Sequence, residues 1–109
     1  EIIRELDKNH INHQIQVNQY PTSKVLVQLD NGIPSYTIVE DVAWDYLQAR
    51  PEDIALVKKA DAVCYGSLAL RSPQSRTAIK TLLANTNPAA IKLFDINLRY
   101  VQMQNRPIW

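Results

Sequence analysis

The stretch Ala60–Arg76, ADAVCYGSLALRSPQSR, changes from a strand pattern to a helix pattern and decides the fold class. Residues 60–66 are an apolar run apart from Asp61, which is typical of a β-strand covered on both faces. Ser72 can cap a helix that begins at Pro73, because proline needs no N–H donor in the first turn. The inward positions of this helix recur at helical spacing, and they are Ala78, Ile79, Leu82 and Leu83. The stretch therefore predicts a strand that leads into a helix.

A second segment, AIKLFDIN at residues 90–97, follows that helix and predicts another strand. Strand, helix and strand in this order make one βαβ unit, with parallel strands and a right-handed crossover. The two strands can be direct neighbours or can have one strand between them. One such unit does not bury both faces of a parallel sheet, so the pattern predicts a fragment of an α/β fold.

The segment from Ile15 to Glu40 has a period of two, which predicts strands. Asn31-Gly32 lies between two such runs and is the strongest short hairpin signal, because both residues tolerate positive φ. Counting outward from this turn puts one set of side chains on a single face: Val25, Val27, Leu29, Pro34, Tyr36 and Ile38. A two-stranded ribbon is marginal alone, so this face must meet a third strand, another chain or a ligand-bearing surface. Residues 13–18 are the candidate third strand.

Helical patterns lie on both sides of the ribbon. Residues 1–10 are a charged helical pattern, and the chain opens inside it without Met, so we expect a piece of a longer protein. Residues 42–49, VAWDYLQA, are also helical, with Trp44 as a core anchor. Another helix is predicted to start at Pro51, because acidic residues follow it in the first turn.

Composition excludes some classes of partner. The chain has 109 residues, of which 46% are hydrophobic and 21% are charged, with a net charge of +1. Lys and Arg are scattered, so no footprint for nucleic acid or an anionic membrane is expected. No apolar run approaches the roughly 20 residues that cross a bilayer. Cys64 is a single cysteine in an apolar run, which predicts a buried, inert thiol and a cytoplasmic protein.

Candidate site residues follow the two predicted strands of the βαβ unit. Gly66 and Ser67 come after the first strand, and Asp95, Asn97 and Arg99 come at the end of the second. Ligands of open α/β sheets bind beyond the carboxyl ends of the strands. The guanidinium of Arg99 suits a phosphate or a pair of sugar hydroxyls, and the Asn97 amide and Asp95 carboxylate can bind or orient such groups. The alternative is that Asp95 and Arg99 pair with each other or cap nearby backbone.

Other candidates are weaker. Tyr36 can pack within the ribbon or form a wall over a ligand. Gly66 allows close approach of backbone or a tight turn. His10 and His13 have no companion ligands nearby, so no metal site is expected. With only two glycines and no nucleophile motif, the chain has no phosphate-cradling loop, no assigned catalytic residue and no complete catalytic cycle.

Three segments in series carry a family resemblance: YPTSKVLVQLDNGIPSYTIVEDVAWDYL (Tyr20–Leu47), ADAVCYGSLALRSPQSR (Ala60–Arg76) and FDINLR (Phe94–Arg99). In these segments, and in their order and spacing, the chain resembles the ribokinase-like (PfkB) carbohydrate kinases, most closely their fructokinase-like branch. The similarity runs from Glu1 to Arg99.

The resemblance implies ATP-dependent phosphoryl transfer to a sugar hydroxyl. It implies a Rossmann-like (ribokinase-like), three-layer α/β fold with a parallel sheet, closed by a small β-sheet lid. Residues 12–40 would be the lid ribbon and residues 41–109 the βαβ part of the core. The implied substrate-binding residues are Tyr36, Gly66, Ser67, Asp95, Asn97 and Arg99. ATP and Mg²⁺ are implied cofactors whose binding residues lie mostly outside this chain, and the lid ribbon can pair with that of a second subunit.

Departures from the family pattern limit this interpretation. The family's N-terminal glycine-rich sugar segment and its C-terminal Gly-Ala-Gly-Asp motif, which holds the catalytic Asp, do not occur here. The tail YVQMQNRPIW, residues 100–109, also matches the family poorly. We therefore expect an inactive fragment of a sugar kinase with its substrate side present. The alternative is a non-catalytic interaction module that pairs with another chain through its exposed β ribbon.

Overall fold

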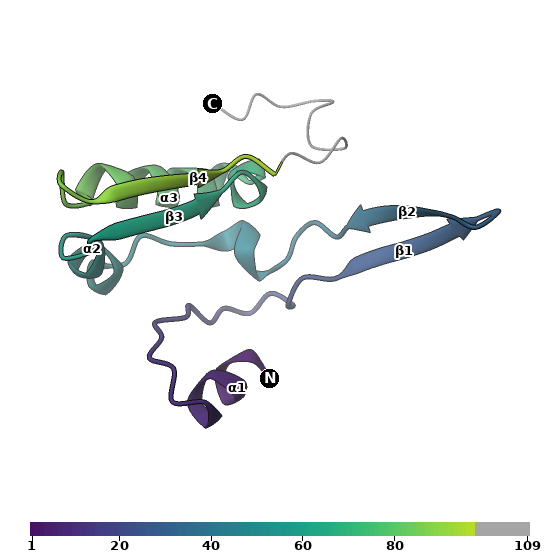
Figure 1. Ribbon diagram of the computed structural model, residues 1–109, viewed down its shortest axis with the longest axis horizontal. Helices are drawn as coiled ribbons and strands as arrows, with labels where there is room; N and C mark the ends of the chain where they lie inside the picture. Colours follow the sequence, from purple (N-terminus) through teal and green to yellow (C-terminus); the bar gives the residue numbers. More distant parts are fainter. Residues whose placement is uncertain (98–109) are drawn as a thin grey trace.

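The computed structural model describes residues 1–97 (Figure 1). Its elements are, in chain order, α1 (Ile2–Lys8), β1 (Val25–Asp30), β2 (Ile33–Ile38), the 3₁₀ helix η1 (Ala43–Tyr46), α2 (Pro51–Val57), β3 (Ala62–Gly66), the 3₁₀ helix η2 (Leu68–Arg71), α3 (Pro73–Asn85) and β4 (Ile91–Asp95). The predicted helices at Pro51 and Pro73 begin at those residues. The order confirms a mixed α/β chain.

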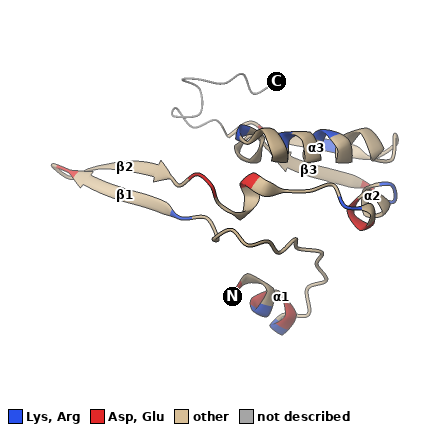
Figure 2. Ribbon diagram, turned by 180° about the vertical axis from the view of Figure 1, so that it is seen from behind, with Lys and Arg blue, Asp and Glu red and all other residues tan. Residues whose placement is uncertain are grey.

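The βαβ unit is the part of the fold that positions the candidate site. β3 and β4 pair in parallel as direct neighbours, from Ala62 opposite Ile91 to Gly66 opposite Asp95. This decides between the two arrangements that the sequence allowed. α3 lies behind the two-stranded sheet in Figure 1 and in front of it in the reverse view of Figure 2, so it covers one face.

The other face of this sheet is open within residues 1–97. Side chains alternate between the faces of a strand, so Cys64 and Leu93 share the face opposite to Val63 and Phe94. Leu93 and Ile91 are both more than half exposed, and Cys64 is exposed as well. The prediction of a buried thiol in a strand covered on both faces is therefore wrong for the described chain, because helix α3 covers only one side.

The hairpin has the predicted register. β1 and β2 pair antiparallel with Val27 opposite Tyr36 and Asp30 opposite Ile33. Asn31 and Gly32 both have positive φ, at 48° and 82°, as a type I′ turn requires. The hairpin extends away from the β3–β4 sheet in both ribbon views (Figures 1 and 2). Its apolar face is therefore formed but is not covered by the rest of the described chain.

The predicted third strand is wrong, because residues 13–18 form no strand. The alternation instead turns amide side chains toward the folded core. The Gln14 and Gln16 amides donate to the Asp53 carboxylate at 2.7 and 2.8 Å, and Asn18 donates to the Ala43 carbonyl at 2.9 Å. The apolar partners of this alternation stay exposed, most of all Val17.

The core lies where α3 meets η1 and η2. Its buried apolar side chains are Val42, Leu70, Ala78 and Ile79. Leu82 and Leu83 are half-buried, so the predicted inward face of α3 is confirmed for its first half. Ser72 is the N-cap residue of α3, but its hydroxyl donates to the Asp45 carbonyl and makes no cap bond.

Candidate functional site

The tips of β3 and β4 bring four predicted site residues together. Gly66 pairs with Asp95, and the Ser67 backbone N–H donates to the Asp95 carbonyl at 3.0 Å. The Ser67 hydroxyl donates to the Ile96 carbonyl at 3.3 Å, and this serine is only 2% exposed. Ser67 therefore ties the two tips together and sets the distance between them.

Asp95 and Asn97 lie on the exposed side of these tips. The Asn97 backbone N–H donates to Asp95 Oδ1 at 3.1 Å, which holds the chain in a local turn after β4. Both residues are exposed, so carboxylate and amide groups are available to a ligand. Arg99 lies outside the described residues, and its predicted role and its alternative pairing with Asp95 are not tested.

The backbone conformation at position 66 does not require glycine. Its φ lies outside the left-handed region, in contrast to Gly32. A Cβ atom at Gly66 would meet the Asp95 carbonyl oxygen at 3.8 Å, which is an ordinary contact. A left-handed turn is therefore not the reason for glycine here, and the backbone of β4 leaves room for a larger residue.

Tyr36 is not brought to the strand tips in this structure. It lies on β2 and is 61% exposed. β2 is separated from the tips of β3 and β4 in both ribbon views (Figures 1 and 2). A wall over a ligand would therefore require the hairpin to move toward the sheet.

A buried ion pair between Arg71 and Asp45 lies between the hairpin and the sheet, and the sequence did not predict it. Arg71 Nε donates to Asp45 Oδ1 at 2.8 Å and Nη2 donates to Oδ2 at 2.7 Å. Burial raises the pKa of Asp45, but hydrogen bonds from Arg71 and the Val42 N–H outweigh it and lower the pKa below its usual value. The only signal in the sequence was two opposite charges in apolar surroundings, which does not specify a partner.

A second carboxylate, Asp53, joins α2 to the N-terminal segment. Arg50 holds both of its oxygens at 2.8 Å, and Gln14 and Gln16 donate to it as well. The hydrogen bonds from Arg50, partly opposed by burial, lower the pKa of Asp53 to about 2. Asp53 therefore fastens residues 14–16 to the core and is a structural group.

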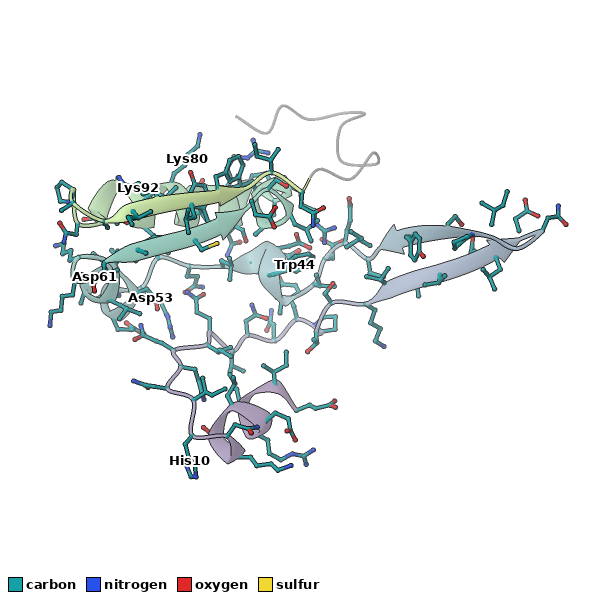
Figure 3. All side chains as sticks on the ribbon, viewed as in Figure 1. His10, Trp44, Asp53, Asp61, Lys80 and Lys92 are labelled. Atoms are coloured by element: carbon teal, nitrogen blue, oxygen red, sulfur yellow. The ribbon has the colours of Figure 1, made fainter. Side chains whose placement is uncertain are left out.

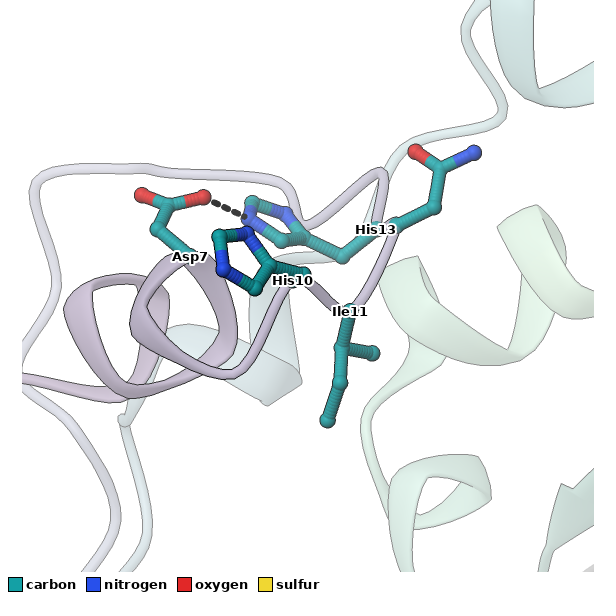
Figure 4. Close-up of a pocket in the computed structure, with 5 residues that line it drawn as sticks. Asp7, His10, Ile11 and His13 are labelled. Atoms are coloured by element: carbon teal, nitrogen blue, oxygen red, sulfur yellow. Dashed lines mark hydrogen bonds and ion pairs between the residues drawn. The ribbon is translucent and has the colours of Figure 1, made fainter.

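The hollow beside α1 does not form a metal centre. It is lined by Asp7, His10, Ile11, Asn12 and His13 (Figure 4). His13 Nε2 lies 3.0 Å from Asp7 Oδ1, and the dashed line in Figure 4 marks this contact. Within residues 1–97, no group of three or more His, Cys, Asp or Glu side chains is placed to hold a metal ion.

The described residues do not fit an ATP or Mg²⁺ site. The two glycines lie at a hairpin turn and at a strand tip, and neither belongs to a phosphate-cradling loop. Acidic side chains in this part of the chain do not gather as metal ligands. No catalytic step through ATP or Mg²⁺ is assigned to residues 1–97. None of the described helices is long and apolar enough to span a membrane.

The chain is similar in sequence to the uncharacterized sugar kinase PH1459 of Pyrococcus horikoshii. The identity is 27% over 100 residues, which cover 90% of this chain and 32% of that protein. The crystal structure of PH1459 superposes with a TM-score of 0.74 at 25% identity, over 94% of this chain and 36% of the other. Its complex with ATP gives a TM-score of 0.74 at 26% identity, over 92% and 34%. No protein-family model matches the sequence.

These similarities bear on the fold and on the family resemblance. The chain is homologous to a segment of a sugar kinase and has the corresponding part of that fold. It spans about a third of the length of the proteins it matches. The activity of a whole protein is therefore a proposal for this chain.

Proposed function

We propose that this chain is the substrate side of an ATP-dependent carbohydrate kinase. The observation that carries the proposal is the pairing of Gly66 with Asp95, which puts Asp95 and Asn97 at one exposed edge of a parallel sheet. The homology to a sugar kinase, one structure of which holds ATP, supports a phosphorylated sugar as the product. A fructose-like sugar is the first acceptor to test, following the fructokinase-like resemblance.

Each site residue has a proposed task in that reaction. The Asp95 carboxylate accepts hydrogen bonds from sugar hydroxyls, and the Asn97 amide donates to or accepts from a neighbouring hydroxyl. Arg99 stabilises the charge of the phosphoryl group as it moves. Gly66 lets the sugar approach the sheet closely, and Ser67 keeps the two strand tips at a fixed separation. Residues 12–40 act as a lid whose apolar face, with Tyr36, excludes water from the transfer.

Other parts of the proposal concern the longer protein. The catalytic base, the ATP pocket and the Mg²⁺ ligands lie outside this chain, so residues 1–109 alone are expected to be inactive. The lid ribbon pairs with that of a second subunit in a homodimer. The cytoplasm supplies ATP and keeps the exposed Cys64 thiol reduced.

A second function is favoured by one observation, the exposure of the hairpin. Leu29 is 74% exposed on a ribbon face that the described chain does not cover. A β ribbon with an apolar face and free edges can bind another chain by adding a strand. The alternative is therefore a non-catalytic interaction module.

Calorimetric titration separates the two functions. Fructose and ATP are titrated into this chain and into a version extended at both ends, alone and with Asp95→Asn. We expect the extended protein to bind sugar and to convert ATP to ADP in its presence as the sugar is phosphorylated, and the Asp95→Asn variant to bind sugar more weakly. An extended protein that binds no sugar and turns over no ATP would leave only the interaction module.

A further inference from the structure

The hairpin is joined to the core at its base by a small set of contacts. In the segment before β1, the Pro21 carbonyl accepts a hydrogen bond from the Ala43 N–H at 2.9 Å, and Tyr20 stacks on Tyr46 with ring centres 3.5 Å apart. The segments before β1 and after β2 are joined by the Val39 N–H, which donates to the Lys24 carbonyl at 3.1 Å. The segment before β1 therefore contacts η1, and the segment after β2 leads directly into η1.

Arg71 adds a contact that joins this base to the strand tips. In addition to its two bonds with Asp45, Arg71 Nη2 donates to the Val39 carbonyl at 2.7 Å. Val39 is the first residue after β2, and Arg71 is the last residue of η2, which starts immediately after Ser67. Among residues 1–97, this hydrogen bond directly joins a side chain of η2, the helix after the β3 tip, to the end of the hairpin. The Arg71 guanidinium thus holds the end of the hairpin and η2 together.

The chemistry of this junction requires arginine. The Arg71 side chain is 11% exposed and that of Asp45 7% exposed, so the pair is held away from water. The guanidinium carbon lies 5.1 Å from the centre of the Trp44 ring, which covers one of its faces, and Figure 3 shows Trp44 between hairpin and sheet. A planar fork reaches both carboxylate oxygens and the Val39 carbonyl at once, whereas a lysine ammonium cannot match that geometry.

We infer that Arg71 is a positioning residue, which sets the direction of the β1–β2 hairpin relative to the tips of β3 and β4 through its bond to the Val39 carbonyl. The inference about direction stands on these contacts alone. Its consequence for catalysis rests on the proposed function: a misdirected hairpin cannot move toward the sheet in the direction that brings its apolar face to the sugar. Sugar binding is then weakened and ATP binding is not.

The direction of the hairpin can be measured without any activity. Spin labels are placed at Gln28→Cys on the hairpin and Lys80→Cys on α3, in the extended protein with Cys64→Ser. All three side chains are exposed, and Lys80 lies on the sheet side of the molecule in Figure 3. Pulsed electron paramagnetic resonance then gives the distribution of distances between the two labels. We expect one narrow distribution, which Arg71→Lys broadens or shifts while Ile79→Val, a mild core change in α3, leaves it unchanged.

A second variant keeps the inference testable if Arg71→Lys does not fold. Arg71→Met together with Asp45→Asn removes both charges at once, so no unpaired buried charge remains, and it also removes the Val39 bond. We expect the same broader distribution in this double variant. A narrow, unshifted distribution in a folded Arg71→Lys or double variant overturns the inference.

Kinetics test the consequence for the site. In the extended protein, Arg71→Lys is expected to raise the KM for sugar by roughly threefold or more and to leave the KM for ATP unchanged. When residues 24–39 are replaced by a short Gly-Ser linker, Arg71→Lys should no longer change the KM for sugar, because the lid that Arg71 directs is gone. A shifted distance distribution with no kinase activity would refute the proposed function and keep the inference. Equal rises in both KM values would refute the link to the site.

Discussion

The hairpin and the junction between η1, η2 and α3 are built in opposite ways. The hairpin has regular backbone pairing, with every strand residue except Ile38 exposed. The junction has little regular backbone pairing, yet it buries the Asp45–Arg71 ion pair and the side chain of Ser75. A ribbon can be specified by its turn and its alternation, whereas the junction depends on side chains that meet across 26 residues or more. The difference separates what local sequence determines from what tertiary contact determines.

The junction should be the most sensitive part of the molecule. Asp45→Ala leaves the Arg71 guanidinium buried without its counter-charge, so we expect a loss of about 3–5 kcal/mol in the free energy of unfolding. Urea unfolding followed by tryptophan fluorescence measures it. As a matched control, Asp30→Ala at the exposed end of the hairpin should change the free energy of unfolding by less than about 0.5 kcal/mol. Similar losses in both variants would contradict the contrast.

Asp53 should show a smaller effect with a defined pH dependence. Its pKa is about 2 in the folded chain against a usual 3.8, so the ionised form is favoured by folding. The stability it contributes is present above about pH 4 and is lost as the pH falls through about 2. Asp53→Asn should therefore cost up to about 2 kcal/mol at pH 7 and little at the acid end.

Unfolding of wild type and Asp53→Asn between pH 2 and 7 checks this. The two stability curves should converge toward low pH. A constant difference across the whole range would show that packing, and not the charge of Asp53, is responsible.

Substitutions at the strand tips should change the activity of the protein and leave its stability unchanged. In the extended protein, Arg99→Ala is expected to lower kcat by at least about tenfold, because a group that meets the moving phosphate acts in the transition state. Asp95→Asn should mainly raise the KM for sugar. Melting temperatures measured beside the kinetics should barely change. A parallel fall in melting temperature would indicate a structural role for these residues.

The two glycines offer the smallest effects and a direct comparison. Gly32→Ala forces alanine into the left-handed region at φ 82°, which should cost about 1 kcal/mol of stability. Gly66→Ala has space for its Cβ atom and should change stability by less than about 0.5 kcal/mol. If a sugar approaches this strand tip, calorimetry should show weaker binding for Gly66→Ala alone.

Local patterns predicted much of this fold. The Asn31-Gly32 turn determined every pair of the hairpin, and the apolar runs determined both parallel strands. The third strand failed because a period of two does not say which set of side chains faces the core, and Gln14 and Gln16 face it here. Whether Cys64 is covered depends on neighbours beyond the described chain.

Part of the candidate site could be predicted from the parallel topology. Parallel topology is enough to place Gly66, Ser67, Asp95 and Asn97 at one edge, because the carboxyl ends of neighbouring parallel strands meet there. It could not reveal that Ser67 is buried or that Gly66 has room for a side chain. The Arg71–Asp45 pair was missed because its partners come from two 3₁₀ helices and are 26 residues apart in the sequence, so no local pattern links them.

The short β3–β4 sheet also has a consequence for handling the protein. Within residues 1–97 each of these strands pairs only with the other, so each has an outer edge of free backbone donors and acceptors. Such an edge, next to an open apolar face, is a template on which further chains can add strands. The isolated chain is therefore expected to scatter light increasingly as its concentration rises. A version long enough to supply the neighbouring strands should remain clear at the same concentration.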